Sequence, residues 1–425
     1  MIQDKWIKMI VWPLFIVTVI SLLWTIYLGL QKFCGGIVPA DVITEWLINY
    51  QGGFVRRGLI GEILLHICNS LDIPVVWFVV GLYFLGVLTL VGILIRVSKK
   101  IPGLLYLLPY PIFLYVFAGF RLIITRRDAW LLILAFSVFG LLQEYLKEQK
   151  LTQLIGINVL LCFGILIHEA SVFYTFSLVL VTSFVMFCKA NHDLMRSVTK
   201  MLLLWWPVIV VLLLVSVYHG DARSAKLIAD SWKPFLDDVT LSGTSAYDFM
   251  EWNVTDAIRE TSKSWFTISW GIPVALFNLY VIAGTYYLVT HASVFYSFLH
   301  YQKNCRNESE LYVKIGAVMI VQGICLTPLA LLFMSDLSRV LAYWTISSVM
   351  ASYLLQDVRW IPSFALRLSA IIYQKIDRIK LLSSPLTYFL VLITLPVGFH
   401  HGELLGVFPC LTLELKSYIW SLLIS

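Results

Sequence analysis

The sequence has little charge for its length. Only 13% of its 425 residues are charged and 60% are hydrophobic, whereas an average globular protein carries roughly 25% charged residues. So few polar side chains cannot cover the surface of a soluble protein of this size. The composition therefore excludes an ordinary soluble enzyme, a disordered chain and a nucleic-acid-binding protein, and it indicates a polytopic membrane protein.

Other features are also missing. The seven cysteines are scattered, with no Cys-x-x-Cys pair and no ligand spacing, so neither a disulfide framework nor a metal site is predicted, and we expect no cofactor. No internal repeat or Pro/Gly-rich linker divides the chain, and we expect residues 1–425 to form one integral membrane domain. The first apolar segment lacks a cleavage site, so we interpret it as a retained helix.

Long apolar runs predict about eleven transmembrane helices, because a helix needs about 20 mainly apolar residues to cross the hydrocarbon core. The predicted spans are 9–30, 75–96, 102–120, 129–146, 152–167, 170–188, 201–218, 268–291, 313–334, 340–357 and 384–399. The predicted fold class is therefore all-α, a polytopic membrane helix bundle. Its largest soluble insert is a loop at 219–266.

The distribution of lysine and arginine predicts the orientation. With the N-terminus in the cytoplasm, the inner segments hold 18 of the 31 Lys and Arg residues but only 8 of the 25 Asp and Glu residues. The C-terminus and the loop at 219–266 then lie outside. The basic, amphipathic stretch 359–381 is expected to lie on the inner membrane surface, where a plain linker helix is the simplest interpretation.

Ionisable residues gather at turns that this topology places outside. A charge toward the bilayer centre costs roughly 2.5–3.5 kcal/mol, so such residues normally face a partner or a water-filled cavity. Five turns bring such residues to about the same depth, which predicts one outward-facing cavity rich in guanidinium groups. Its predicted members are Arg56, Arg57, Arg121, Arg126, Arg127, Asp128, His168, Glu169, Asp336, Arg339 and His400.

This set of side chains suits the recognition of a phosphate or diphosphate. Arginine presents a planar fork that matches phosphate oxygens and keeps its charge at all relevant pH values. Glu169, Asp128 and His168 are candidates for the general base that takes a proton from an attacking hydroxyl. Together the residues suit glycosyl transfer from a lipid-linked donor, with the arginines stabilising the departing phosphate.

Each part of this set also has a simpler interpretation. Arg56 and Arg57 can snorkel to the interface, and Arg126 to Asp128 can form a structural ion pair. His168 and Glu169 can form an exposed turn, and Asp336 can pair with Arg339 three residues later. In the loop at 219–266, the aromatic residues suit either sugar stacking or anchoring at the membrane interface.

In layout and in four short stretches the chain resembles the Wzy-type bacterial polysaccharide polymerases, which belong to the multi-spanning glycosyltransferases that use lipid-linked donors. The stretches are GGFVRRGLIGE, RRDAW, HEASVF and SDLSR. The resemblance implies an enzyme of the bacterial inner membrane that polymerises undecaprenyl-diphosphate-linked oligosaccharide repeats into surface polysaccharide such as O-antigen. It implies an active site in the periplasm, no metal, and a chain-length regulator as a protein partner beside the lipid bilayer.

The resemblance also implies roles for individual residues. Outer-face arginines would bind the diphosphate, and an acidic or histidine residue would act as the base. The chain departs from other lipid-linked transferases in its first outer loop, which usually carries a prominent acidic pair. Here Asp41 and Glu45 lie four residues apart and upstream of the arginines, so they remain alternative bases.

Two other functions fit the same residues. A transferase that adds one sugar from a polyprenyl monophosphate donor would use a similar outer-face site. A transporter or flippase for an anionic, lipid-linked solute is the second alternative, although transporters often show inverted repeats and charges near the midplane. The lipid-linked glycans of a deletion strain would separate these functions.

Overall fold

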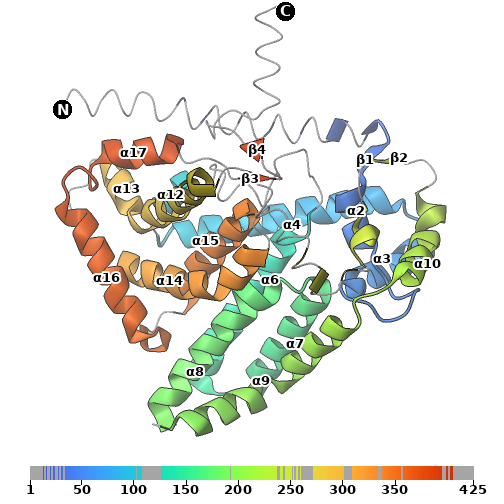
Figure 1. The fold of residues 1–425 in the computed structure, drawn as a ribbon, viewed down its shortest axis with the longest axis horizontal. Coiled ribbons are helices and arrows are strands. Elements are labelled where there is room, and N and C mark those ends of the chain that lie inside the picture. Colours follow the sequence, from blue (N-terminus) through green and yellow to red (C-terminus); the bar gives the residue numbers. More distant parts are fainter. Residues whose placement is uncertain are drawn as a thin grey trace, which may run out of the picture. The chain divides into compact units, whose positions relative to one another are not determined.

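The computed structural model describes most of the chain. It covers residues 34–101, 103–107, 126–191, 193–236, 240–242, 245–250, 271–300, 309–332, 337–355, 358–394, 399–400 and 403–404, with single positions at 13, 16, 20, 23, 27, 30, 31, 252, 255, 256 and 259. These residues are almost all helical, and their strands form only two short pairs (Figure 1). The predicted all-α membrane fold is therefore confirmed.

Among the described residues, five helices are long and apolar enough to cross a membrane. They correspond to the predicted spans 75–96, 129–146, 170–188, 201–218 and 313–334. Four further predicted spans are helical, but their described residues are not both long and apolar enough to meet this criterion. The predicted spans 9–30 and 102–120 lie largely outside the described residues. The protein is thus a multi-pass membrane protein, and the total of eleven spans stays a prediction.

The described residues group into two compact units, which are treated separately here. The first is made of residues 1–27, 92–122 and 264–425, and the second of residues 28–91 and 123–263. The helix α4 (Val75–Ser98) contributes residues to both. All of the closely paired charges described below lie in the second unit.

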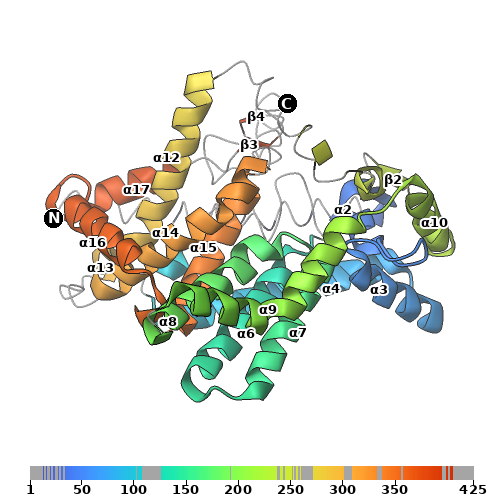
Figure 2. The same ribbon diagram turned by 60° about the horizontal axis from the view of Figure 1, so that its bottom comes forward.

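The second unit contains a group of long helices that pack side by side (Figure 2). They are α6 (Asp128–Glu148), α7 (Leu151–Ile167), the π-helical turn η2 (Val172–Phe176), α8 (Ser177–Asn191) and α9 (Leu194–Val217). The turn between α6 and α7 is tight because Gln149 takes a left-handed conformation and ends α6. The side chain of Asp193 accepts hydrogen bonds from two backbone N–H groups and so caps α9.

A smaller group of short elements packs together in the same unit (Figure 1). It contains β1 (Ile37–Pro39), α2 (Ala40–Leu47), α3 (Gly58–Leu71), α10 (Ala222–Trp232), η3 (Lys233–Phe235), β2 (Thr240–Ser242) and η4 (Ala246–Phe249). The strands β1 and β2 pair in parallel, with Ile37 opposite Thr240. The predicted outer loop is therefore in large part folded, and it packs against the segment that carries Arg56 and Arg57.

The indole of Trp232 holds α10 against α2. Trp232 is fully buried, and its N–H donates to the carbonyl of Leu47 at 2.6 Å. Nearby, Thr44 accepts a hydrogen bond from the backbone N–H of Ala246 at 2.8 Å. Trp232 is thus a core residue, and neither sugar stacking nor interfacial anchoring describes it.

The first unit is also helical. It contains η1 (Leu104–Leu107), α12 (Gly271–Thr290), α13 (Ala292–His300), α14 (Ser309–Leu332), α15 (Leu337–Leu354), η7 (Val358–Trp360), α16 (Ser363–Arg378), α17 (Pro385–Thr394) and the strand pair β3 (Phe399–His400) and β4 (Glu403–Leu404). The helix α14 packs against α12, α15 and α16. Polar side chains join these helices, since Gln322 donates to Ser347 at 3.1 Å and Trp344 donates to the Met319 carbonyl at 2.6 Å.

Candidate functional site

The loop between α2 and α3 carries the two adjacent arginines, and it is held in place from several sides. The carboxylate of Glu62, on α3, accepts from the backbone N–H of Tyr50 at 2.9 Å and from the side chain of Gln51 at 3.3 Å. The backbone N–H of Arg56 donates to the carbonyl of Tyr218, just after α9, at 2.9 Å. The loop is therefore positioned by α3 and by the end of α9.

Two glycines of the loop region occupy positions that a residue with a side chain would not fit. Gly53 has a φ of +100°, which is unfavourable for residues with a side chain. Gly61 lies so close to α2 that a Cβ atom there would come within 2.0 Å of the Ile48 carbonyl oxygen. The glycines of the GGFVRRGLIG stretch thus let the loop turn and let α3 approach the end of α2.

Arg57 has an unusual backbone for a residue with a side chain. Its φ is 63° and its ψ is 8°, in the left-handed region, and it is the N-cap of α3. This conformation costs about 1–2 kcal/mol for a residue other than glycine. Such strain clusters at functional sites, where the surrounding structure over-determines it. The surrounding structure therefore holds the strained backbone of Arg57, and this strain is an indication that the loop is a functional site.

The guanidinium of Arg57 forms a two-point contact with the carboxylate of Glu169, which lies 112 residues later in the chain. The Arg57 Nε donates to Glu169 Oε2 at 2.8 Å, and Nη2 donates to Oε1. Both side chains keep some exposure, 20% for Arg57 and 28% for Glu169. The structure therefore joins two residues that the sequence placed in different outer turns, in a contact that remains accessible from outside the protein.

A second carboxylate links this pair to another arginine. Glu45, on α2, lies 3.9 Å from Nη1 of Arg57 and 3.8 Å from Nη2 of Arg127. Arg127 is 1% exposed and is the N-cap of α6, whose first residue, Asp128, is fully buried. Two arginines and two carboxylates from four segments thus form one network. We call Glu45, Arg57, Arg127 and Glu169 the charge cluster.

His168 fixes the turn that presents Glu169. Its Nδ1 accepts a hydrogen bond from the backbone N–H of Ala170 at 3.1 Å and lies 3.8 Å from Glu169 Oε2. A nitrogen that accepts carries no proton, so this arrangement favours the neutral tautomer with its proton on Nε2. The π-helical turn η2 follows directly, and such turns occur frequently at functional sites. His168 therefore has a structural role, because it holds the turn that positions Glu169.

The surroundings shift the pKa values of three residues in these turns. Burial raises the pKa of Glu169, but the guanidinium groups of Arg57 and Arg56 outweigh it and hold that pKa well below its ordinary value of 4.5. Burial lowers the pKa of Arg56, and Glu169 opposes this shift. Burial and Glu62 raise the pKa of Tyr50 to about 12. At neutral pH, Glu169 is thus an anion and the phenol of Tyr50 stays protonated.

The remaining predicted site residues fall elsewhere. Arg126 is half-buried beside Arg127, whereas Arg121 and Asp336 lie outside the described residues. Arg339 belongs to the first unit, where its Nε donates to the hydroxyl of Tyr343 at 3.3 Å. His400 lies on β3 of the first unit and pairs with Glu403 on β4. The predicted site residues that the structure brings together, Arg57, Arg127 and Glu169, all lie in the second unit.

Two acidic residues of this site were not among the predicted members. Glu45 was only an alternative base, and the signal that favoured it was its place just upstream of the arginines. Glu62 gave no signal of its own, because a single glutamate near the start of a helix is ordinary. Among the described residues, no group of three or more His, Cys, Asp and Glu side chains is arranged to hold a metal.

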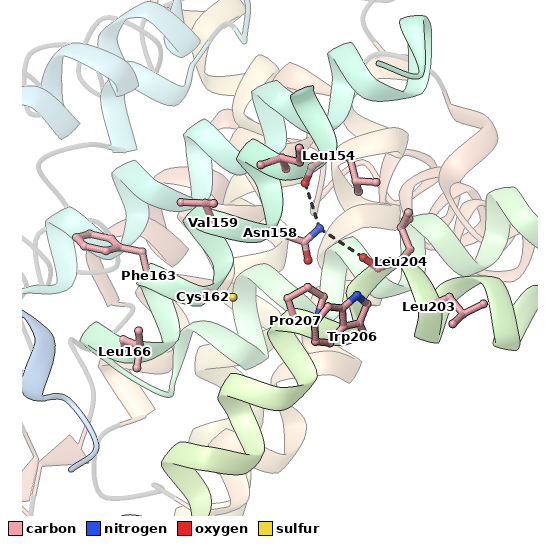
Figure 3. Close-up of a pocket in the computed structure, with 11 residues that line it drawn as sticks. Leu154, Asn158, Val159, Cys162, Phe163, Leu166, Leu203, Leu204, Trp206 and Pro207 are labelled. Atoms are coloured by element: carbon pink, nitrogen blue, oxygen red, sulfur yellow. Dashed lines mark hydrogen bonds between the residues drawn. The ribbon is translucent and has the colours of Figure 1, made fainter. Parts of the chain in front are cut away.

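An apolar groove lies between α7 and α9 in the same unit (Figure 3). It has a volume of about 550 Å³. Asn158 is its main polar residue, and its amide nitrogen donates to the carbonyls of Leu154 and Leu204 at 3.1 and 3.4 Å. These hydrogen bonds occupy the amide nitrogen, whereas the amide oxygen is buried without a hydrogen-bond partner among the described residues. The other lining residues are almost all apolar.

The chain was compared with known proteins. It matches the model of a family described as "Uncharacterised membrane protein Rv1490" over residues 14–267, more than half of the chain. The chain belongs to this family. No curated protein and no solved structure matches it. The matched region contains the charge cluster and the groove, and the membership supports a membrane protein without specifying a polymerase.

Proposed function

We propose that this protein is a glycosyltransferase that polymerises undecaprenyl-diphosphate-linked oligosaccharide repeats into surface polysaccharide. The observation that carries the proposal is the charge cluster, because it joins arginines and carboxylates from four distant segments of a membrane protein. Charged groups in membrane proteins are costly and normally serve a pathway, a substrate or a reaction. The enzyme would lie in the bacterial inner membrane, with its N-terminus in the cytoplasm and the cluster on the periplasmic side.

Helix dipoles support an anionic substrate at this place. Arg57 is the N-cap of α3 and Arg127 is the N-cap of α6, and the N-terminus of a helix carries partial positive charge. Backbone N–H groups there are a ready site for phosphate oxygens. Arg56 adds a third guanidinium, so the site presents both charge and donors to a diphosphate.

Glu169 is the base that this arrangement favours. Asp128 is fully buried, and His168 uses Nδ1 to accept a backbone N–H, whereas Glu169 is ionised and partly exposed. In the free enzyme, Arg57 holds the pKa of Glu169 low and so makes it a weak base. A bound diphosphate competes for Arg57, which raises the pKa of Glu169 and makes it a better proton acceptor for the attacking hydroxyl.

The test compares single variants with a double variant. Arg57→Ala and Glu169→Gln should each leave lipid-linked single repeats and no long chains, while the protein still accumulates in the membrane. The double variant Arg57→Glu/Glu169→Arg keeps an ion pair, yet it should also lack polymer. If the double variant restores the full ladder of chain lengths, the pair is structural and Glu169 is not the base. A normal ladder in a deletion strain would show that the proposed function is wrong.

Other glycan patterns would point to the alternatives. Loss of a single sugar with chain length preserved would favour the single-sugar transferase. Absence of bond-forming activity in purified protein, with impaired movement of a lipid-linked solute across the membrane in charge-neutralising variants, would favour a transporter. A chain-length regulator, the protein partner that the polymerase resemblance implies, would alter the distribution of lengths and leave the requirement for Arg57 and Glu169 unchanged.

A further inference from the structure

The groove between α7 and α9 runs along the membrane-spanning part of the second unit. Its lining extends on α7 from Leu154 to Leu166, which corresponds to about 18 Å at 1.5 Å per helical residue. That is more than half of the roughly 30 Å hydrocarbon core of a bilayer. The α7 wall of the groove is therefore long enough to follow an extended hydrocarbon chain, and α9 lines it from Leu203 to Pro207.

Both helices that line the groove end near the arginine pair; the lining itself reaches Leu166 on α7 and Pro207 on α9. The helix α7 ends at Ile167, two residues before Glu169, which contacts the Arg57 guanidinium. The helix α9 ends at Val217, one residue before Tyr218, whose carbonyl accepts from the backbone N–H of Arg56. Two independent contacts thus join the C-terminal ends of both walls to the same two arginines.

We propose that this groove binds the isoprenoid tail of the lipid carrier while its phosphate group is held at Arg56 and Arg57. The inference rests on the proposed function, since it names the part of the lipid-linked substrate that the groove would take. An apolar wall that ends at a cationic group is complementary to a ligand with one apolar tail and an anionic head.

The shape of the wall favours a single branched chain. Phe163, Trp206 and Pro207 line the groove together with branched aliphatic residues, and Figure 3 shows their side chains gathered between the two helices. Methyl-branched isoprene units can fill such an uneven wall through many van der Waals contacts. A phospholipid has two acyl chains without methyl branches and matches this wall less well.

Photocrosslinking tests the occupant. The full-length protein, purified in detergent, is irradiated with an undecaprenyl phosphate analogue that carries a diazirine on its tail, and crosslinked peptides are mapped by mass spectrometry. We expect crosslinks on α7 and α9 that at least tenfold excess undecaprenyl phosphate removes. Equal competition by phosphatidylglycerol, or crosslinks confined to other helices, would overturn the proposal.

Two variants provide the matched comparison. Val159→Trp fills the groove and should reduce crosslinking at least fivefold. Leu88→Trp places the same ring on α4, where the side chain is 69% exposed, and should leave crosslinking at the wild-type level. Equal labelling of both variants would contradict the assignment.

A second measurement avoids substitution altogether. Cys162 lines the groove and is partly exposed, so undecaprenyl phosphate should slow its alkylation by a membrane-permeant maleimide severalfold. Alkylation of Cys188, which is also partly exposed on α8, provides the reference and should not change. An unchanged rate at Cys162 would overturn the proposal without reference to any folding defect.

Different results would contradict the groove assignment and the proposed polymerase function. If crosslinks map to the groove while a deletion strain still makes normal polymer, the protein binds a polyprenyl lipid but the proposed function is wrong. If the deletion strain loses polymer while crosslinks fall elsewhere, the enzyme stands and the groove assignment is wrong.

Discussion

Arg57 combines a strained backbone with a demanding side-chain contact. Its left-handed φ directs the side chain from the N-cap of α3, and its guanidinium meets Glu169 at two points. Among the described residues, a left-handed backbone also occurs at Asp72 and Gln149, where no such ion pair accompanies it. The occurrence of both features at one residue, next to a second arginine, indicates that the loop is shaped to present this guanidinium.

Replacing Arg57 by lysine tests whether the planar fork matters. Lysine keeps the charge but cannot form two parallel hydrogen bonds to one carboxylate or phosphate. Loss of one charged hydrogen bond costs about 1.5–3 kcal/mol, so we expect polymer formation to fall about tenfold to a hundredfold. Polymer yield relative to membrane protein level is the measurement, and Lys99→Ala, on a predicted inner segment, should stay at the wild-type level.

Acidic pH should weaken the second unit through Glu169. Its pKa in the folded protein lies below the ordinary value of 4.5, so its ionised form stabilises the fold above that pH, and the stabilisation is lost as pH falls through the folded pKa. The stability difference between wild type and Glu169→Gln should therefore shrink from pH 7 to pH 3. Thermal unfolding in detergent measures it, and a constant difference would contradict the assignment.

Helix α3 depends on a close approach that a single methyl group blocks. Gly61 faces the end of α2, where a Cβ would meet backbone atoms that cannot turn away. The position of Arg57 depends on the same approach, because Arg57 begins α3. Packing between these two short helices therefore determines where the guanidinium lies.

Gly61→Ala should destabilise the protein and reduce polymer formation. Overpacking of this kind typically costs 1–3 kcal/mol, so we expect a loss of about that size. Gly81→Ala on α4 is the matched control, since nothing lies within 4 Å of its added Cβ. Unfolding midpoints in detergent measure both, and equal midpoints would show that α3 can shift without cost.

For the whole molecule, the predicted orientation is open to a labelling experiment. Lys150 lies between α6 and α7 on the predicted inner side, and Arg223 lies on α10 on the predicted outer side. Both side chains are exposed. In intact bacterial cells a membrane-impermeant maleimide should label Arg223→Cys and spare Lys150→Cys, and the reverse pattern would invert the topology.

Composition and charge were enough to predict the helical membrane fold and much of the charge cluster. Charges at the ends of apolar runs stand out in a sequence, which is why Arg57, Arg127 and Glu169 could be selected. The burial of Trp232 could not be predicted, because it depends on contacts with α2. Its hydrogen-bond partner there, Leu47, lies 185 residues away in the sequence. Glu62 was missed for a related reason, since its partners are the backbone N–H of Tyr50 and the side chain of Gln51 in the preceding loop.

The separation of Arg57 and Glu169 also bears on how the protein is made. At 5–20 residues per second, a ribosome needs roughly 6–22 s to synthesise the 112 residues between them. Until then, Glu45 is the one carboxylate of the charge cluster that is available to Arg57. The two-point contact that completes the cluster therefore forms only after α7 has been synthesised.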